Sequence, residues 1–173
     1  MGRHCTQFYS SFLRKARLSV YALGIFTFFL FPKTSKAIGN DFDPVLISLN
    51  APKIGKTDVP GLINGQTLYV SVLDLFDFLK IKAEALPEGR IGGYILDQND
   101  VYLLSLSENS ISYKGVIHPI EQGSLQEFDG NLYLETSYFG EIFDLHCKFD
   151  YRNLAMKLET DADLPILKII RRD

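Results

Sequence analysis

The chain has 173 residues, two cysteines and a formal net charge of −3 at pH 7. This length fits an N-terminal targeting segment followed by one domain, or by two small subdomains that share a core. Two cysteines are too few for the disulfide framework that stabilises many small secreted domains, and no N-x-S/T glycosylation acceptor is present, so a bacterial envelope protein is favoured over a eukaryotic secreted one.

Residues 1–37 have the layout of a secretory signal peptide. The segment before Leu18 contains basic but no acidic residues, and Leu18–Phe31 carries no charge. Pro32 then breaks the apolar run, and Ser35-Lys36-Ala37 offers small residues for cleavage before Ile38. The alternative is an uncleaved membrane anchor, although the apolar run is shorter than the roughly 20 residues of a spanning helix. We expect an exported protein, periplasmic or associated with the cell envelope.

Removal of this signal changes the charge and the chemistry of the chain. Subtracting its six Lys and Arg from the total of 18 leaves 12 against 21 Asp and Glu, a formal charge near −9. Such an acidic domain is a poor match for nucleic acid, whose binding depends on clustered Lys and Arg. Cys5 leaves with the signal, so Cys147 is the only cysteine of the mature chain, and we expect it to be a buried small apolar residue.

Two segments of the chain are similar to each other. Thr67–Ile81 aligns with Asn131–Leu145 without a gap, and each copy follows a turn dipeptide, Asn64-Gly65 or Asp129-Gly130. Such dipeptides favour tight hairpin turns, because both central residues take positive φ. Each copy then continues through a short strand into an apolar-periodic segment. The pattern predicts a repeated unit of hairpin, short helix and hairpin.

The first predicted helix has a clear start and one apolar face. Ser71 is its expected cap, with Asp74 as the capping-box partner. Its buried stripe comprises Val72, Leu75, Phe76 and Leu79.

In the second predicted helix, Thr136 is the expected cap and the stripe comprises Phe139, Ile142 and Phe143. Gly140 lowers helix propensity by roughly 1 kcal/mol relative to Ala, so we expect it to mark a close approach to another element.

Short strands make up the rest of the predicted structure. We expect strands at Val45–Leu49, Val59–Ile63, Leu68–Val70, Tyr94–Leu96, Val101–Leu106, Ile111–Tyr113, Val116–Ile120, Leu132–Leu134, Cys147–Phe149 and Leu154–Leu158. In the last of these, Leu154, Met156 and Leu158 alternate with Ala155 and Lys157, as in a half-buried strand. The expected fold is a strand-dominated α+β domain in which two related units, residues 38–123 and 124–162, pack together. Residues 163–173 form an apolar and basic C-terminal segment.

The order of strand, short helix and hairpin after Tyr69 and after Tyr133 resembles the copper amine oxidase N-terminal-like repeat, a non-catalytic stalk module. The likeness is carried by Tyr69–Ile81 and Tyr133–Leu145, although the glycine-rich helix end of that family is replaced by Lys80-Ile81-Lys82 and Asp144-Leu145-His146. This resemblance implies no copper site. The exit at Asp163-Leu164-Pro165 also resembles the N-terminal region of outer-membrane usher-like proteins.

The residues offer little chemistry for catalysis or cofactor binding. The mature chain has two histidines, His118 and His146, which is too few for the usual zinc sites. His146 and Cys147 are adjacent on a predicted strand, so their side chains would point to opposite faces. Asp97-Gln98-Asn99-Asp100 lacks the alternate spacing of a calcium loop and is expected to be a solvated turn. We therefore predict no catalytic residue, no metal and no cofactor.

Two surfaces are candidates for binding a partner. Tyr94, Tyr138 and Tyr151 would form an aromatic surface for a peptide or glycan if the fold brought them together. The C-terminal segment is expected to begin as a helix capped by Asp163. It would contact a membrane or a protein partner through Ile166, Ile169, Ile170, Arg171 and Arg172, unless it leads into a longer protein.

These observations favour a non-catalytic envelope module that binds or positions another envelope component, either a protein or a surface polymer. It would act alone or as the leading domain of an outer-membrane assembly protein. The alternative is a small secreted hydrolase or polysaccharide-acting enzyme that uses paired carboxylates, with Asp74, Asp77 and Glu141 as its candidates. Convergence of two carboxylates in a concave pocket would favour the enzyme.

Overall fold

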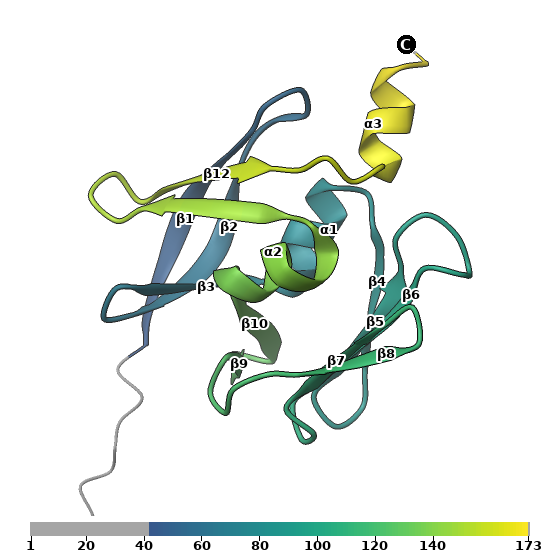
Figure 1. The fold of residues 1–173 in the computed structure, drawn as a ribbon. Helices are drawn as coiled ribbons and strands as arrows, with labels where there is room; N and C mark the ends of the chain where they lie inside the picture. The colour runs from purple at the N-terminus through teal and green to yellow at the C-terminus, as the bar shows by residue number, and fades with distance from the viewer. Residues whose placement is uncertain (1–41, 173) are drawn as a thin grey trace, which may run out of the picture. The chain divides into compact units, whose positions relative to one another are not determined.

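The computed structural model describes residues 42–172. The predicted signal peptide, residues 1–37, lies outside the described residues. The described part of the chain is rich in strands and contains few helices, arranged as two sheets and three short helices (Figure 1). The prediction of a strand-dominated α+β fold is therefore confirmed.

The larger sheet has seven strands in the order β11-β12-β1-β2-β3-β10-β9. Neighbouring strands are antiparallel except for β1 and β12, which are parallel. The strands of this sheet are β1 (Asp43–Ala51), β2 (Gly55–Asn64), β3 (Thr67–Ser71), β9 (Leu125–Phe128), β10 (Asn131–Glu135), β11 (His146–Asp150) and β12 (Ala155–Glu159).

The smaller sheet is an antiparallel meander in the order β4-β5-β6-β7-β8. Its strands are β4 (Lys82–Leu86), β5 (Arg90–Tyr94), β6 (Val101–Ser105), β7 (Ser110–Tyr113) and β8 (Val116–Pro119). In chain order, β2-β3-α1-β4-β5 and β9-β10-α2-β11-β12 are both hairpin, helix and hairpin.

The helix α1 (Val72–Phe78) begins where the sequence predicts. The Ser71 side chain accepts a hydrogen bond from the backbone N–H of Asp74 at 3.4 Å, and its hydroxyl donates to the Asp74 carboxylate. Val72, Leu75 and Phe76 are buried, and Leu79 just beyond the helix is buried as well. The predicted cap and stripe are both confirmed.

The other two helices begin differently from the predictions. α2 (Thr136–Phe143) has Glu135 at its N-cap and no side-chain cap, because β10 runs directly into the helix and makes Thr136 its first helical residue. α3 (Pro165–Ile170) is preceded by Leu164 rather than by a capping Asp163, although Pro165 does stand in its first turn. Leu164 is fully buried, so tertiary packing holds this start in place of a side-chain hydrogen bond.

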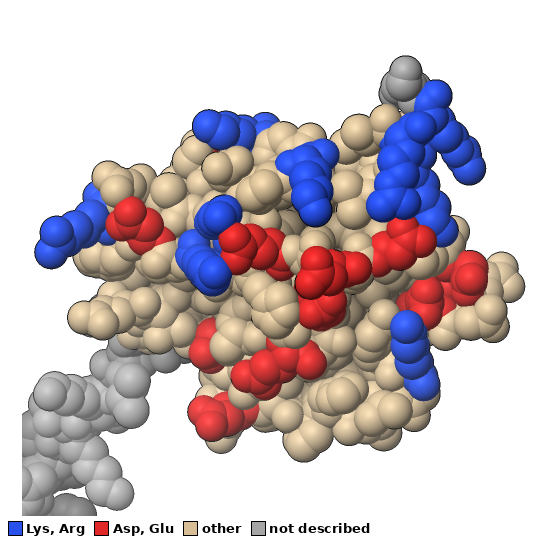
Figure 2. Space-filling model, turned by 45° about the horizontal axis from the view of Figure 1, so that its top comes forward, with Lys and Arg blue, Asp and Glu red and all other residues tan. Residues whose placement is uncertain are grey.

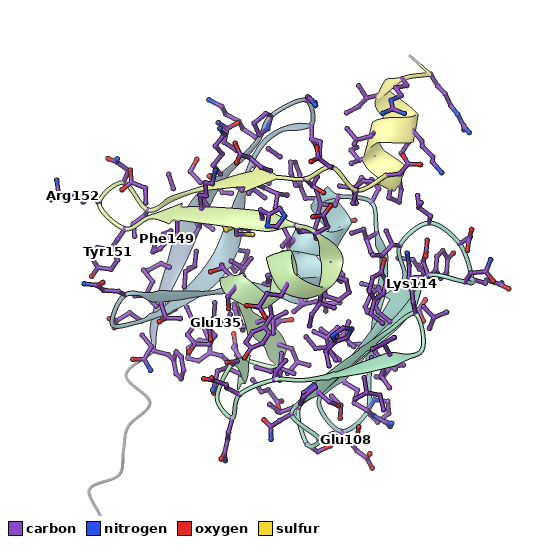
Figure 3. The ribbon with its side chains drawn as sticks, in the orientation of Figure 1. Glu108, Lys114, Glu135, Phe149, Tyr151 and Arg152 are labelled. Atoms are coloured by element: carbon purple, nitrogen blue, oxygen red, sulfur yellow. The ribbon has the colours of Figure 1, made fainter. Side chains whose placement is uncertain are left out.

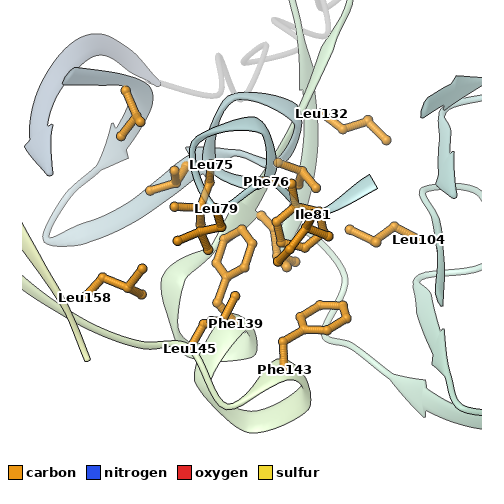
Figure 4. Close-up of a cluster of buried hydrophobic side chains, with 14 of the residues drawn as sticks. Leu75, Phe76, Leu79, Ile81, Leu104, Leu132, Phe139, Phe143, Leu145 and Leu158 are labelled. Atoms are coloured by element: carbon orange, nitrogen blue, oxygen red, sulfur yellow. The ribbon is translucent and has the colours of Figure 1, made fainter. Parts of the chain in front are cut away.

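The core is built around the aromatic residues of α1 and α2 (Figure 4). The ring of Phe76 makes edge contacts with Phe139 and Phe143 of α2 at centroid distances of 6.0 and 5.6 Å. It also contacts Tyr102 of β6 at 5.2 Å. Phe143 contacts Tyr113 of β7 at 5.2 Å, so both helices pack against the smaller sheet. Two helices this short would not persist alone in water, and this packing supplies their stability.

The hairpin of β4 and β5 was not predicted, and the predicted strand Tyr94–Leu96 is wrong beyond its first residue. β4 is largely exposed and therefore lacks the apolar alternation of a half-buried strand. β5 contains Gly92-Gly93, which lowers strand propensity. Gly93 is required by tertiary packing, because a Cβ at this position would lie 1.8 Å from the backbone oxygen of Lys82.

Three smaller differences concern strands and turns. β9 was not predicted, and Leu154 lies in a turn with φ of 47° and is exposed instead of starting β12. The predicted turn Asp129-Gly130 is confirmed, with positive φ at both residues. In the other hairpin Asn64 pairs with Thr67, so the turn residues are Gly65 and Gln66, and only Gly65 has positive φ.

Candidate functional site

A groove lies beside α3, and we call it the α3 groove. Its volume is about 1070 Å³. Its walls come from the β1–β2 turn (residues 52–54), from β11, from β12 with the segment that follows it (residues 157–163), and from α3. The sheet positions three of these walls, because β1 lies next to β12 and β12 next to β11.

Charged side chains are paired across the strands at one wall of the groove. His146 lies opposite Glu159, and Lys148 lies directly opposite Lys157. Like charges facing each other across two strands are destabilising. Glu159 offsets this repulsion, since its carboxylate contacts the Nζ atoms of Lys148 and Lys157 at 2.6 and 2.7 Å. The hydrogen bonds and charges of these two lysines lower the pKa of Glu159 to about 2.

The strand register extends this pair into a row of side chains. Lys157 is aligned with Asn50 of β1, and Asn50 with Lys56 of β2. Lys148, Lys157, Asn50 and Lys56 are all exposed and therefore share the solvent face of the larger sheet. We call these four residues the lysine row. On the face shown in Figure 2, most Lys and Arg lie in the upper part, with Asp and Glu mainly in a band below them.

The helix α3 forms the opposite wall. Leu167, Ile170 and Arg171 line the groove, while Ile166 and Leu167 pack against the core. Ile169 and Ile170 are about half exposed, at 47% and 43%.

Of the residues predicted to contact a partner, Ile166 thus belongs partly to the core, whereas Ile169, Ile170, Arg171 and Arg172 are exposed. Lys168 pairs with Asp163 at 3.3 Å.

The three tyrosines named from the sequence lie on three separate elements. Tyr94 ends β5 and is 38% exposed. Tyr138 on α2 packs against the core, and its hydroxyl accepts a hydrogen bond from the backbone N–H of Glu121 at 3.0 Å. Tyr151 is exposed in the β11–β12 turn beside Phe149 (Figure 3). Among the described residues, none of the aromatic ring pairs joins two of these tyrosines.

The other candidates from the sequence have structural partners. The Sγ atom of Cys147 lies 3.5 Å from the backbone oxygen of Leu145, and burial raises the pKa of this thiol to about 12. His146 is exposed and bonded to Asp144 at 2.9 Å, so it diverges from Cys147 as predicted. His118 lies in β8 opposite Ile111.

The run at residues 97–100 is a turn in which Asn99 donates its backbone N–H to Asp97 at 2.7 Å, while Asp100 pairs with Lys114 at 3.0 Å. Within residues 42–172, no group of three or more His, Cys, Asp or Glu side chains is placed to hold a metal ion.

The carboxylates proposed for the alternative enzyme lie outside the α3 groove. Asp74 bonds to Ser71 at the start of α1, Asp77 pairs with Lys80 at 3.4 Å, and Glu141 is exposed on α2. The groove instead contains Glu159, Asp161 and Asp163, which sequence reasoning missed. The turn predicted at residues 150–153 would place Lys148 opposite Ala155, whereas the observed register places Lys148 opposite Lys157 and so brings the two lysines together at Glu159.

Comparisons with known proteins add no family to this description. No family model matches the chain, and no curated protein or solved structure is significantly similar to it. Among the helices that the structure describes, none is long and apolar enough to span a membrane.

Proposed function

We propose that this chain is an exported, non-catalytic module of the bacterial cell envelope that binds or positions another envelope component through the α3 groove. The observation that carries the proposal is the groove itself. It combines apolar residues of α3 with four cationic side chains, Lys53, Lys148, Lys157 and Arg171, on a domain that is acidic as a whole. Mixed apolar and charged walls of this kind suit a protein segment or a surface polymer.

The fold supports a second part of the proposal, that the domain contains two related units. β3 and β10 are paired with Val70 opposite Leu134, Tyr69 opposite Glu135 and Ser71 opposite Tyr133. In the gapless sequence alignment, Val70 corresponds to Leu134, Tyr69 to Tyr133 and Ser71 to Glu135. Exchanging the two segments therefore turns the pair Tyr69–Glu135 into the pair Tyr133–Ser71. We propose that an approximate two-fold axis at Val70 and Leu134 relates the two units. This arrangement supports a duplicated, stalk-like module of the copper amine oxidase N-terminal type.

The electrostatics of the groove favour binding over hydrolysis. A general acid needs a carboxyl group whose pKa is raised toward neutrality. Glu159 has its pKa lowered to about 2 by two lysines, so it remains ionised and serves to hold Lys148 and Lys157 in place. Asp163 is likewise paired with a lysine. These pairs organise a charged surface without preparing a proton donor.

The binding proposal is tested with the full-length chain and envelope material from bacterial cells. The double variant Lys148→Gln/Lys157→Gln removes two cations from the groove. Its matched control, Lys80→Gln/Lys82→Gln, removes two exposed lysines outside the groove. Charge-assisted contacts contribute about 1.5–3 kcal/mol each, so the groove variant should bind at least roughly tenfold more weakly than the wild type. Equal binding by both variants and the wild type contradicts the proposal.

Three further observations separate the versions of this proposal. Residues 1–37 fused to a reporter enzyme that is active only outside the cytoplasm should give an active reporter if they are a signal. Hydrolysis of envelope polysaccharides by the wild type, lost in Glu159→Gln, would instead support the alternative enzyme. The role as leading domain of an outer-membrane assembly protein would gain support from a reading frame that continues beyond Asp173 into alternating strands.

A further inference from the structure

The four edge strands of the two sheets differ in how they are protected. Exposed sheet edges offer unpaired backbone groups, and native proteins commonly place charged side chains there to prevent unwanted pairing. Three of the edges carry charges: Lys148 and Asp150 on β11, Glu127 on β9, and Lys82 and Glu84 on β4. The fourth, β8, has the sequence Val-Ile-His-Pro and carries no Lys, Arg, Asp or Glu.

The same strand exposes its apolar side chains. Ile117 is 69% exposed, the highest value for any large hydrophobic side chain among residues 42–172, and Val116 is 56% exposed. Both lie on a strand in regular antiparallel pairing with β7, so they are presented on a defined surface.

The backbone of β8 has one free donor on its outer edge. The N–H of Ile120 donates to the carbonyl of Asn109 at 2.9 Å, on the side of β7. Because backbone groups alternate along a strand, the amides of Val116 and His118 also face β7, and those at positions 117 and 119 face outward. Pro119 has no N–H. The outer edge therefore offers the N–H and C=O of Ile117, followed by a position that cannot donate.

We propose that β8 pairs with β8 of a second copy of this chain, in antiparallel orientation and centred on Ile117. In this arrangement each Ile117 donates its N–H to the carbonyl of the other, so the free N–H and the free C=O of both copies gain partners. Pro119 cannot donate in either copy, so the backbone pairing is confined to this central pair of hydrogen bonds. The self-pairing also joins the two five-stranded sheets edge to edge into one continuous sheet.

Side chains at the ends of β8 fit the same register. Val116 of one copy lies opposite His118 of the other, and the symmetry produces this pair twice, once on each side of the central Ile117 pair. Lys114, in the turn that leads into β8 (Figure 3), is already paired with Asp100 of its own chain at 3.0 Å and takes no part in the new contact.

The proposal is tested by disulfide trapping in the full-length chain, in a background with both Cys5 and Cys147 replaced by alanine. An antiparallel hydrogen-bonded pair has Cα atoms about 5.5 Å apart, within the range of a disulfide. Ile117→Cys should cross-link about tenfold faster than Leu46→Cys under mild oxidation, because pairing turns a random collision into an oriented step. Leu46 is a suitable control, since it is 62% exposed but lies on β1, an interior strand of the larger sheet.

A second measurement follows association without cysteines. Sedimentation of the wild type should show a monomer and dimer in concentration-dependent equilibrium, and Ile117→Lys should shift it to monomer while leaving the circular dichroism spectrum unchanged. A wild type that stays monomeric at millimolar concentration overturns the proposal. So does a dimer that Ile117→Lys leaves intact, or equal cross-linking of the two cysteine variants. This inference is independent of export and of the α3 groove, so either proposal can fail alone.

Discussion

Val70 of β3 and Leu134 of β10 lie directly opposite each other on neighbouring interior strands of the larger sheet, and both side chains are fully buried. They occupy corresponding positions in the two similar segments of the sequence. Each residue therefore packs beside its own counterpart, within the same core as the aromatic residues of α1 and α2.

The first prediction concerns this pair. Leu134→Ala should lower the free energy of unfolding by about 2–5 kcal/mol, because it leaves a cavity in a packed core. Since the two side chains are neighbours, Val70→Ala and Leu134→Ala should couple by about 0.5–3 kcal/mol in a double-mutant cycle. Urea denaturation monitored by circular dichroism measures both effects. Leu46→Ala is the control and should change stability by less than about 0.5 kcal/mol, since this leucine is exposed. Strict additivity would contradict direct contact.

The second prediction compares two adjacent glycines of β5. A Cβ at position 93 would lie 1.8 Å from the backbone oxygen of Lys82, the same oxygen that accepts the Tyr102 hydroxyl at 2.8 Å. Gly93→Ala should therefore separate β4 from β5 and cost more than about 3 kcal/mol, at the upper end of single substitutions. At position 92 the nearest atom is a flexible leucine methyl at 3.0 Å, so Gly92→Ala should cost much less. Thermal unfolding of both variants decides the matter, and equal losses would argue against this close approach.

The third prediction concerns acid. Lys148 and Lys157 hold the pKa of Glu159 at about 2 in the folded chain, below its ordinary value of 4.5. A depressed folded pKa contributes stability that is present above the unfolded pKa and is lost as pH falls from about 4.5 to about 2. Glu159→Gln should therefore be less stable than the wild type at pH 7 and nearly equal to it at pH 2. Denaturation curves at both pH values test this. A difference that persists unchanged at pH 2 would mean that packing, not charge, is lost.

The fourth prediction concerns the thiol of Cys147. Burial raises its pKa to about 12, so the reactive thiolate is scarce in the folded protein at pH 8. In a Cys5→Ser variant, a thiol reagent should modify Cys147 slowly in buffer and rapidly in urea. Adding Ile117→Cys to that variant should introduce one rapidly reacting thiol, because position 117 is exposed. Rapid modification of Cys147 in buffer would show that the strand β11 opens readily.

Local signals predicted the parts of the fold that depend on neighbouring residues. Ser71 and Asp74 cap α1 as expected, and the spacing of Phe139 and Phe143 placed both on the buried face of α2. Lys114-Gly115 has positive φ at both residues, as the short turn between two apolar runs implies. Gly140 lies against another element as expected, because a Cβ there would be 3.0 Å from the His146 ring.

The candidate site could not be predicted in the same way. The α3 groove depends on the parallel pairing of β1 with β12, two strands from opposite ends of the domain. That pairing also completes the lysine row, which joins residues about a hundred positions apart in the sequence. Patterns of hydrophobicity indicate which face of a strand is buried, but they do not indicate which distant strand lies beside it.

The sequence alone determined the strand-rich class, the positions of α1 and α2, and the acidic character of the chain, because these follow from periodicity and composition. The tertiary structure decided the division into two sheets, the hairpin of β4 and β5, and the place of each charged side chain. The physical reason is that β4 and β5 are held by pairing and by a close backbone contact at Gly93, not by apolar alternation. Likewise, β8 became an uncharged edge only because the meander ends there.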